Sequence, residues 1–78
     1  MRVKLQSEAP LPFIRCWHLV NQANDATIQN VIDSIALQFG IQETHLSLSI
    51  QGFILPMDGP TSSFLQVDDL IMYFGYLI

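Results

Sequence analysis

Apolar and polar residues alternate at the start of the chain. Val3 and Leu5 are apolar, and Arg2 and Lys4 beside them are basic. Alternation with a period of two is typical of a strand that buries one face. We therefore expect a strand over residues 1–7 that directs its apolar side chains to the core and its bases outward.

A second strand is expected over residues 13–20, after a loop that contains two prolines. Both of its faces are mostly apolar, so the pattern leaves open which face is buried. We expect Trp17 in or near the core; as an exposed anchor it would be a binding hot spot, and the pattern does not decide between the two. The two faces consist of Phe13, Arg15, Trp17 and Leu19 on one side and Ile14, Cys16, His18 and Val20 on the other.

After a polar turn over residues 21–26, apolar residues recur at intervals of three and four. This spacing predicts a helix over residues 27–39 with one buried stripe. Asp25 or Thr27 can cap its first free N–H groups, and Gly40 can end it in a left-handed conformation. The stripe consists of Ile28, Val31, Ile32, Ile35 and Phe39.

Two short strands are expected next. The first, over residues 46–50, alternates leucine or isoleucine with serine. A tight turn at Gln51 and Gly52 leads into the second strand, over residues 53–55, which ends at Pro56.

The last expected strand covers residues 70–78. The segment before it, over residues 57–66, is expected to be irregular, with Leu65 in the core, and Asp68 and Asp69 are expected to form a turn. The order is thus two strands, a helix, two strands, a loop and a strand. It predicts an α+β fold in which one amphipathic helix packs across a mixed sheet.

Composition limits the chain to a small unit. It has 78 residues, of which 50% are hydrophobic and 13% are charged, so we expect a single folded domain over residues 1–78 rather than disorder. Because the sequence starts within one expected strand and stops within another, we expect it to be the N-terminal part of a longer protein. A lone cysteine excludes a disulfide within the chain.

Charge narrows the range of partners. The chain has three basic and seven acidic residues, which gives a net charge of −4. We therefore expect neither direct nucleic-acid binding nor binding to an anionic membrane. The mean hydropathy of +0.35 indicates surplus apolar surface, which a protein partner would cover.

The element order is similar to that of the ubiquitin-like β-grasp fold, and several motifs resemble the N-terminal domain of the coilin family, scaffold proteins of Cajal bodies. The most specific is the Leu-x-Leu-x-x-x-Gly-Phe-x-Leu-Pro stretch over residues 46–56. The others are residues 2–6, Pro10, Pro12, Trp17, Phe39, Gly40, Leu65 and residues 69–71, and residues 27–35 resemble the start of the ubiquitin helix.

This resemblance implies a self-association domain in a nuclear scaffold protein, without enzymatic activity or a cofactor. The partner would be another copy of the chain, in an assembly that could be open-ended. Other scaffold or ubiquitin-pathway proteins are further partners that it allows. The chain departs from the family in its last strand, which lacks the usual basic residues.

Two surfaces are candidates for such assembly. A basic face on one surface and an acidic face on another would make a head-to-tail contact, although both sets would also suit ordinary solvated charges. The basic face consists of Arg2, Lys4 and Arg15, and the acidic face of Asp58, Asp68 and Asp69.

The last strand offers an apolar alternative. With Ile71 and Tyr73 in the core, its other side chains would form an exposed row suited to an interface or to strand addition at a sheet edge. A missing C-terminal segment, or burial of both faces, would equally explain this row. It consists of Leu70, Met72, Phe74, Tyr76 and Ile78.

Catalytic and metal sites find little support. Cys16 and His18 share a strand face, but the sequence places no third group to orient them, so we expect an inert, buried cysteine. Together with His45 they provide too few ligands for a structural zinc site.

Two further functions are open. The chain could be a ubiquitin-like adaptor that docks on another protein around Leu46, Ile54 and the last strand. It could also be a conjugated modifier if the natural protein continued to a tail ending in two glycines.

Overall fold

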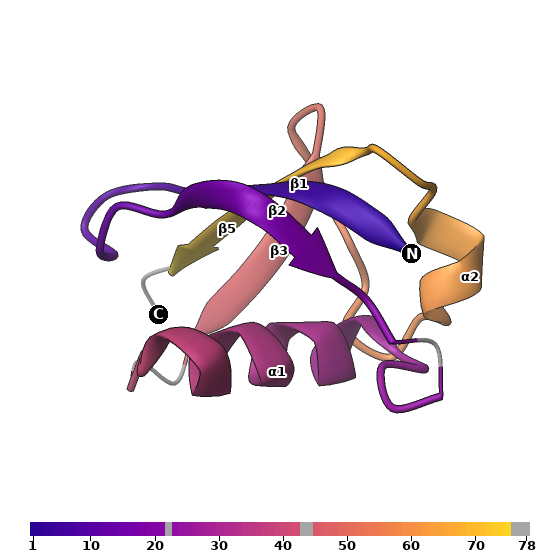
Figure 1. Ribbon diagram of the computed structural model, residues 1–78. Helices are drawn as coiled ribbons and strands as arrows, with labels where there is room; N and C mark the ends of the chain where they lie inside the picture. The colour runs from indigo at the N-terminus through magenta and orange to yellow at the C-terminus, as the bar shows by residue number, and fades with distance from the viewer. Residues whose placement is uncertain (22, 43–44, 76–78) are drawn as a thin grey trace.

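The computed structural model describes residues 1–21, 23–42 and 45–75. Its elements follow the expected order, with one additional short helix (Figure 1). They are β1 (Arg2–Ser7), β2 (Arg15–Leu19), α1 (Ile28–Phe39), β3 (Leu46–Ile50), β4 (Phe53–Ile54), α2 (Thr61–Phe64) and β5 (Leu70–Gly75).

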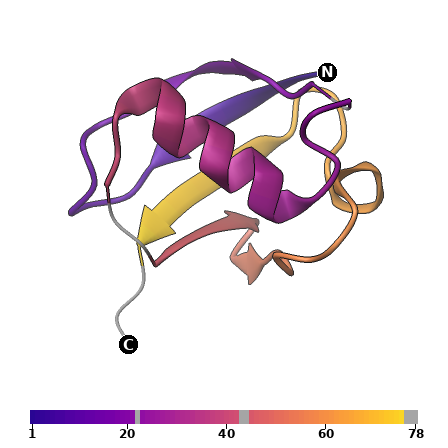
Figure 2. The ribbon, with the colours of Figure 1, turned by 90° about the horizontal axis from the view of Figure 1, so that it is seen from below.

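The strands form one mixed sheet in the order β2-β1-β5-β3-β4. The central pair, β1 and β5, is parallel, and the other neighbours are antiparallel. Figure 1 shows α1 beneath the sheet and α2 at one end, and Figure 2 shows α1 lying across the sheet. The prediction of an α+β fold with one helix packed across a mixed sheet is confirmed.

The core lies between α1 and the sheet. Ile28, Val31, Ile32 and Ile35 of the predicted stripe are buried, and Phe39 packs against the core from its edge. Tyr73 of β5 is fully buried, and its hydroxyl donates a hydrogen bond of 3.3 Å to the Ile32 carbonyl. The sheet and loops contribute Val3, Leu5, Leu11, Ile14, Val20, Ile41, Leu46, Leu48, Leu55, Leu65 and Ile71.

Both ends of α1 agree with the sequence. The Thr27 hydroxyl accepts a hydrogen bond of 3.2 Å from the Asn30 N–H, and the Asn30 side chain accepts one from the Thr27 N–H. This reciprocal capping box satisfies two N–H groups at the helix start. Gly40 ends the helix in the left-handed conformation, with φ of 66°.

The turn between β3 and β4 also forms as expected. Gln51 and Gly52 have φ angles of 54° and 85°, and this pair of positive angles is typical of the turns that match the twist of a hairpin. The hairpin pairs Ile50 with Phe53 and Ser49 with Ile54.

Two expectations about the second half need correction. The segment over residues 57–66 is not wholly irregular, because Thr61–Phe64 forms α2; Leu65 directly after it is buried, as predicted. Strand addition at a sheet edge, one of the roles left open for the last strand, does not fit, because β5 pairs with β1 on one side and β3 on the other. Its expected residues 76–78 lie outside the described residues.

No helix in the described part of the chain is long and apolar enough to cross a membrane.

Candidate functional site

The face of the sheet opposite α1 carries the main candidate site, and we call it the outer face. Because strand side chains alternate, burial of Val3 and Leu5 directs Arg2 and Lys4 to this face. The same alternation assigns side chains from β2 and β5 to it. The outer face consists of Arg2, Lys4, Gln6, Arg15, Trp17, Leu19, Leu70, Met72 and Phe74.

Strand register orders these side chains into rows that cross the sheet. Lys4 lies between Trp17 of β2 and Leu70 of β5. Successive residues on one strand face are about 7 Å apart, so the next row lies that distance away along the strands. It contains Arg15, Gln6 and Met72 and continues to Ser49 and Ile54.

Trp17 is part of the outer face and not of the core. Its side chain is 53% exposed, which contradicts the expectation that it lies in or near the core. The Arg2 guanidinium lies 4.9 Å from the centroid of the indole ring, and the Lys4 ammonium 5.7 Å from it. Such cation–π contacts hold the two bases beside an exposed aromatic ring.

The structure brings together one base and one acid that were expected on different surfaces. Arg2 Nε lies 2.8 Å from Asp68 Oδ1 in an exposed ion pair. The backbone explains this contact, because the Asp68 N–H donates to the Arg2 carbonyl and so places the turn beside β1. For Arg2 and Asp68, the expectation of separate basic and acidic surfaces is therefore wrong.

The other acids do not form one face with Asp68. The Asp69 carboxylate accepts a hydrogen bond of 2.8 Å from the Gln66 N–H within the turn. Asp58 is exposed on the loop that contacts the start of α1, where the Gln29 N–H donates to the Met57 carbonyl. Asp68 and Asp69 thus share one turn, and Asp58 lies on a different loop.

The apolar row of the last strand joins the basic face instead of forming a second surface. Leu70 is 47% exposed and pairs with Lys4, while Met72 and Phe74 are half-buried. Strand addition at β5 is ruled out, because neighbouring strands already occupy both of its sides. Tyr76 and Ile78 lie outside the described residues.

Of the two residues named for the expected adaptor surface, Leu46 and Ile54, only Ile54 is exposed. Leu46 is buried in the core and cannot contact a partner. Ile54 is 66% exposed and pairs with Ser49, at the end of the row that crosses the outer face.

Cys16 and His18 differ in their environments. Cys16 is exposed, which contradicts the expectation of a buried thiol, because β2 is an edge strand and leaves this side chain uncovered. His18 is buried, and burial lowers the pKa of its imidazole. No cluster of three or more metal-ligating side chains occurs in residues 1–21, 23–42 and 45–75.

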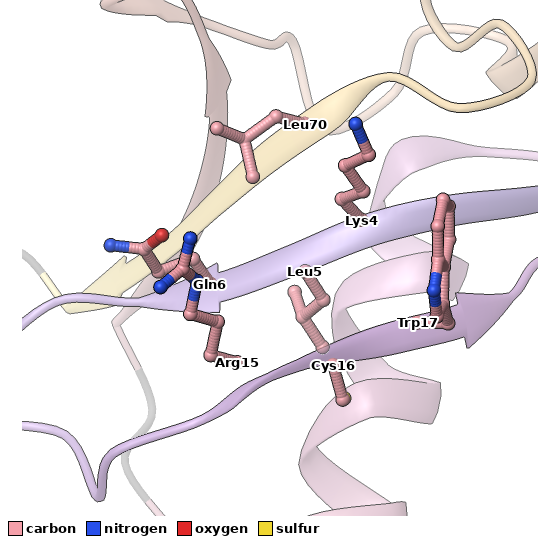
Figure 3. A pocket seen from close by; sticks show the side chains of 7 residues that line it. All are labelled: Lys4, Leu5, Gln6, Arg15, Cys16, Trp17 and Leu70. Atoms are coloured by element: carbon pink, nitrogen blue, oxygen red, sulfur yellow. The ribbon is translucent and has the colours of Figure 1, made fainter.

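A groove of about 450 Å³ lies on the outer face over β1 (Figure 3). Lys4 and Trp17 lie toward one end of it, and Arg15 and Gln6 lie together at the other. The sequence pattern identified the two bases as candidate site residues but did not assign Gln6 or Trp17 to a site. The groove is lined by Lys4, Leu5, Gln6, Arg15, Cys16, Trp17 and Leu70.

Two solved structures are similar to this chain across most of its length. The ubiquitin of Caldiarchaeum subterraneum has a TM-score of 0.74 and 16% identity, with 100% of this chain and 95% of that chain covered. A protein described by its molecular mimicry of SUMO, which promotes DNA repair, has a TM-score of 0.71 and 17% identity, with 94% and 88% covered.

These similarities establish a ubiquitin-like β-grasp fold. They confirm the ubiquitin-like part of the resemblance found in the sequence, and nothing in them points to coilin specifically. No protein-family model matches the chain. No curated protein sequence matches it either.

Proposed function

We propose that this chain is a non-enzymatic protein-docking domain that works through its outer face. One observation carries the proposal: all three bases of a chain with a net charge of −4 gather with exposed apolar side chains on the sheet face opposite α1. Trp17, Leu19 and Leu70 are 53%, 76% and 47% exposed there. An apolar surface bordered by charges is typical of a protein interface.

The first candidate partner is another copy of the chain. Exposed Asp58, on the loop that contacts the start of α1, provides complementary charge away from the basic face, and such a head-to-tail contact can extend beyond a dimer. The resemblance to the coilin N-terminal domain supports a scaffold role in a nuclear body. With this role we also propose a nuclear location and a longer natural chain.

The second candidate is an adaptor that docks on a different protein. The ion pair between Arg2 and Asp68 favours it, because this pair already compensates one of the bases that head-to-tail assembly would use. Ubiquitin-like folds serve many functions, so the fold is compatible with both candidates.

Light scattering behind a sizing column, over a concentration series, separates the two candidates. Self-association predicts that the molar mass rises above 8.8 kDa as the concentration increases. High salt will weaken a contact made by the bases and spare one made by apolar side chains. A constant mass of 8.8 kDa would contradict self-association and favour the adaptor.

A pair of leucine variants locates the contact. Leu70→Ser removes an apolar side chain from the outer face, whereas Leu37→Ser removes one that is 86% exposed on α1. We expect the first to lower the mass and the second to leave it unchanged. An equal fall in mass in both variants would contradict self-association through the outer face.

A further inference from the structure

The groove over β1 has a polar and an apolar part. Lys4 and Arg15 are exposed and form no ion pair with any described residue, so both charges are available to a ligand. Trp17 and Leu70 provide half-exposed apolar surface on the β2 and β5 sides. The groove therefore offers two cations beside an apolar contact (Figure 3).

The backbone beneath the groove is not available for recognition. β1 lies between β2 and β5, and both neighbours pair with it along the groove. A ligand therefore cannot join the sheet as an additional strand there and has to be recognised through side chains. Gln6 adds an amide group that can donate or accept a hydrogen bond.

The separation of Lys4 and Arg15 matches the spacing of side chains in an extended peptide. Lys4 lies opposite Trp17, and Arg15 lies opposite Gln6 in the next row, so the two bases are offset by one strand and two residues. Strand geometry makes this offset about 8 Å between backbone positions. In an extended peptide, side chains two residues apart point to the same side with a separation of about 7 Å.

We propose that this groove binds an extended acidic segment of a partner protein, an inference that rests on the proposed docking function. Two carboxylates, two residues apart, pair with Lys4 and Arg15, and a neighbouring aliphatic side chain packs against Leu70. Charge complementarity favours this ligand, because the bases are concentrated in one place on an otherwise acidic molecule.

The test uses a synthetic peptide and the single tryptophan of the chain. The probe is acetyl-Leu-Ser-Asp-Ser-Asp-amide, and its matched control carries asparagine in place of both aspartates. Binding is followed by heteronuclear NMR, in which Trp17 provides the only indole N–H signal. We expect saturable shifts at Trp17, Lys4 and Gln6, and an affinity about tenfold weaker for the control peptide.

Two variants with the same change in net charge show whether the groove itself is responsible. Lys4→Gln removes a base from the groove, whereas Gln42→Glu adds an acid at an exposed position two residues after Gly40, which ends α1. We expect Lys4→Gln to weaken binding of the acidic peptide about five- to tenfold and Gln42→Glu to change it less than about twofold. Both positions are exposed, so both variants should fold.

Three results would overturn the inference. They are equal binding of the two peptides, an equal effect of the two variants, and no shifts at millimolar peptide. If shifts at the groove instead appear with protein concentration alone, a second copy is the occupant, and the proposed docking function survives without the peptide.

Discussion

His18 is the residue at which the core is least well satisfied. Its side chain is 5% exposed, and Nε2 is the one buried side-chain polar atom without a hydrogen-bond partner among the described residues. Burial lowers its pKa from 6.5, while the negative charge of Asp25 and a polar contact with Gln38 oppose this shift. The neutral imidazole is therefore the form that suits the folded protein.

This environment makes stability depend on pH. The unfolded chain takes up a proton at His18 near pH 6.5, whereas the folded chain does so only at the lowered pKa. The free energy of unfolding should therefore decrease as the pH falls through the window that begins at 6.5 and ends at the lowered pKa. Urea unfolding at about pH 7.5 and about pH 5.5 measures the change above the range of most carboxylates.

His18→Leu is the control for that measurement. It removes the titrating group at this position and keeps His45, so the fall in stability between the two pH values should become smaller. A fall of the same size in the variant would contradict a role for His18, as would a gain in stability on acidification.

The exposure of Trp17 could have been predicted from the sequence pattern of β2. Arg15 was expected on the surface and Trp17 in or near the core, although period two puts both on one face of β2. Because burying a base without a partner costs free energy, the face that carries Arg15 has to be exposed, and Trp17 with it. The cation–π contacts with Arg2 and Lys4 depend on strand pairing, which the sequence pattern does not specify.

At the scale of elements, α1 has the clearest local determinants. Thr27 and Asn30 satisfy each other's backbone N–H groups at its start. Thr27→Ala removes the hydroxyl half of this capping box and should lower the free energy of unfolding by about 1 kcal/mol, as measured by urea unfolding. Thr27→Ser keeps the hydroxyl and should retain most of the stability. Equal losses in the two variants would contradict the capping role.

The helix α1 and the turn between β3 and β4 were predicted correctly, whereas the short helix α2 was missed and the order of the strands in the sheet was not predicted. The stripe of α1, the turn at Gln51 and Gly52, and the burial of Ile71 and Tyr73 follow from periodicity and turn chemistry. The central position of β5 depends on parallel pairing with β1, between segments at opposite ends of the chain. No sequence period encodes such long-range pairing, so the pattern left open whether the last strand lies at an edge.

At the scale of the whole molecule, this central position changes the meaning of the candidate surfaces. Because β5 lies between β1 and β3, its outward side chains continue the face that carries the bases. The apolar and basic sets are therefore parts of one surface and should act together in any contact. A partner that covers Lys4 will also meet Leu70, which pairs with it across the strands.

The three bases should nevertheless contribute unequally to self-association. Arg2 already has a carboxylate 2.8 Å away, whereas Lys4 has no ion-pair partner among the described residues. If a second copy brings acids to this face, Lys4 therefore provides more attraction that is not already compensated within its own chain.

Lys4→Gln and Arg2→Gln test this difference with the same change in net charge. We expect Lys4→Gln to weaken association about two- to fivefold at low salt, and Arg2→Gln by less than about twofold, in light-scattering concentration series. The difference should shrink at high salt, because screening reduces the contribution of exposed charges. A larger effect of Arg2→Gln would mean that the ion pair with Asp68 opens in the assembly and that Arg2 itself contacts the neighbouring copy.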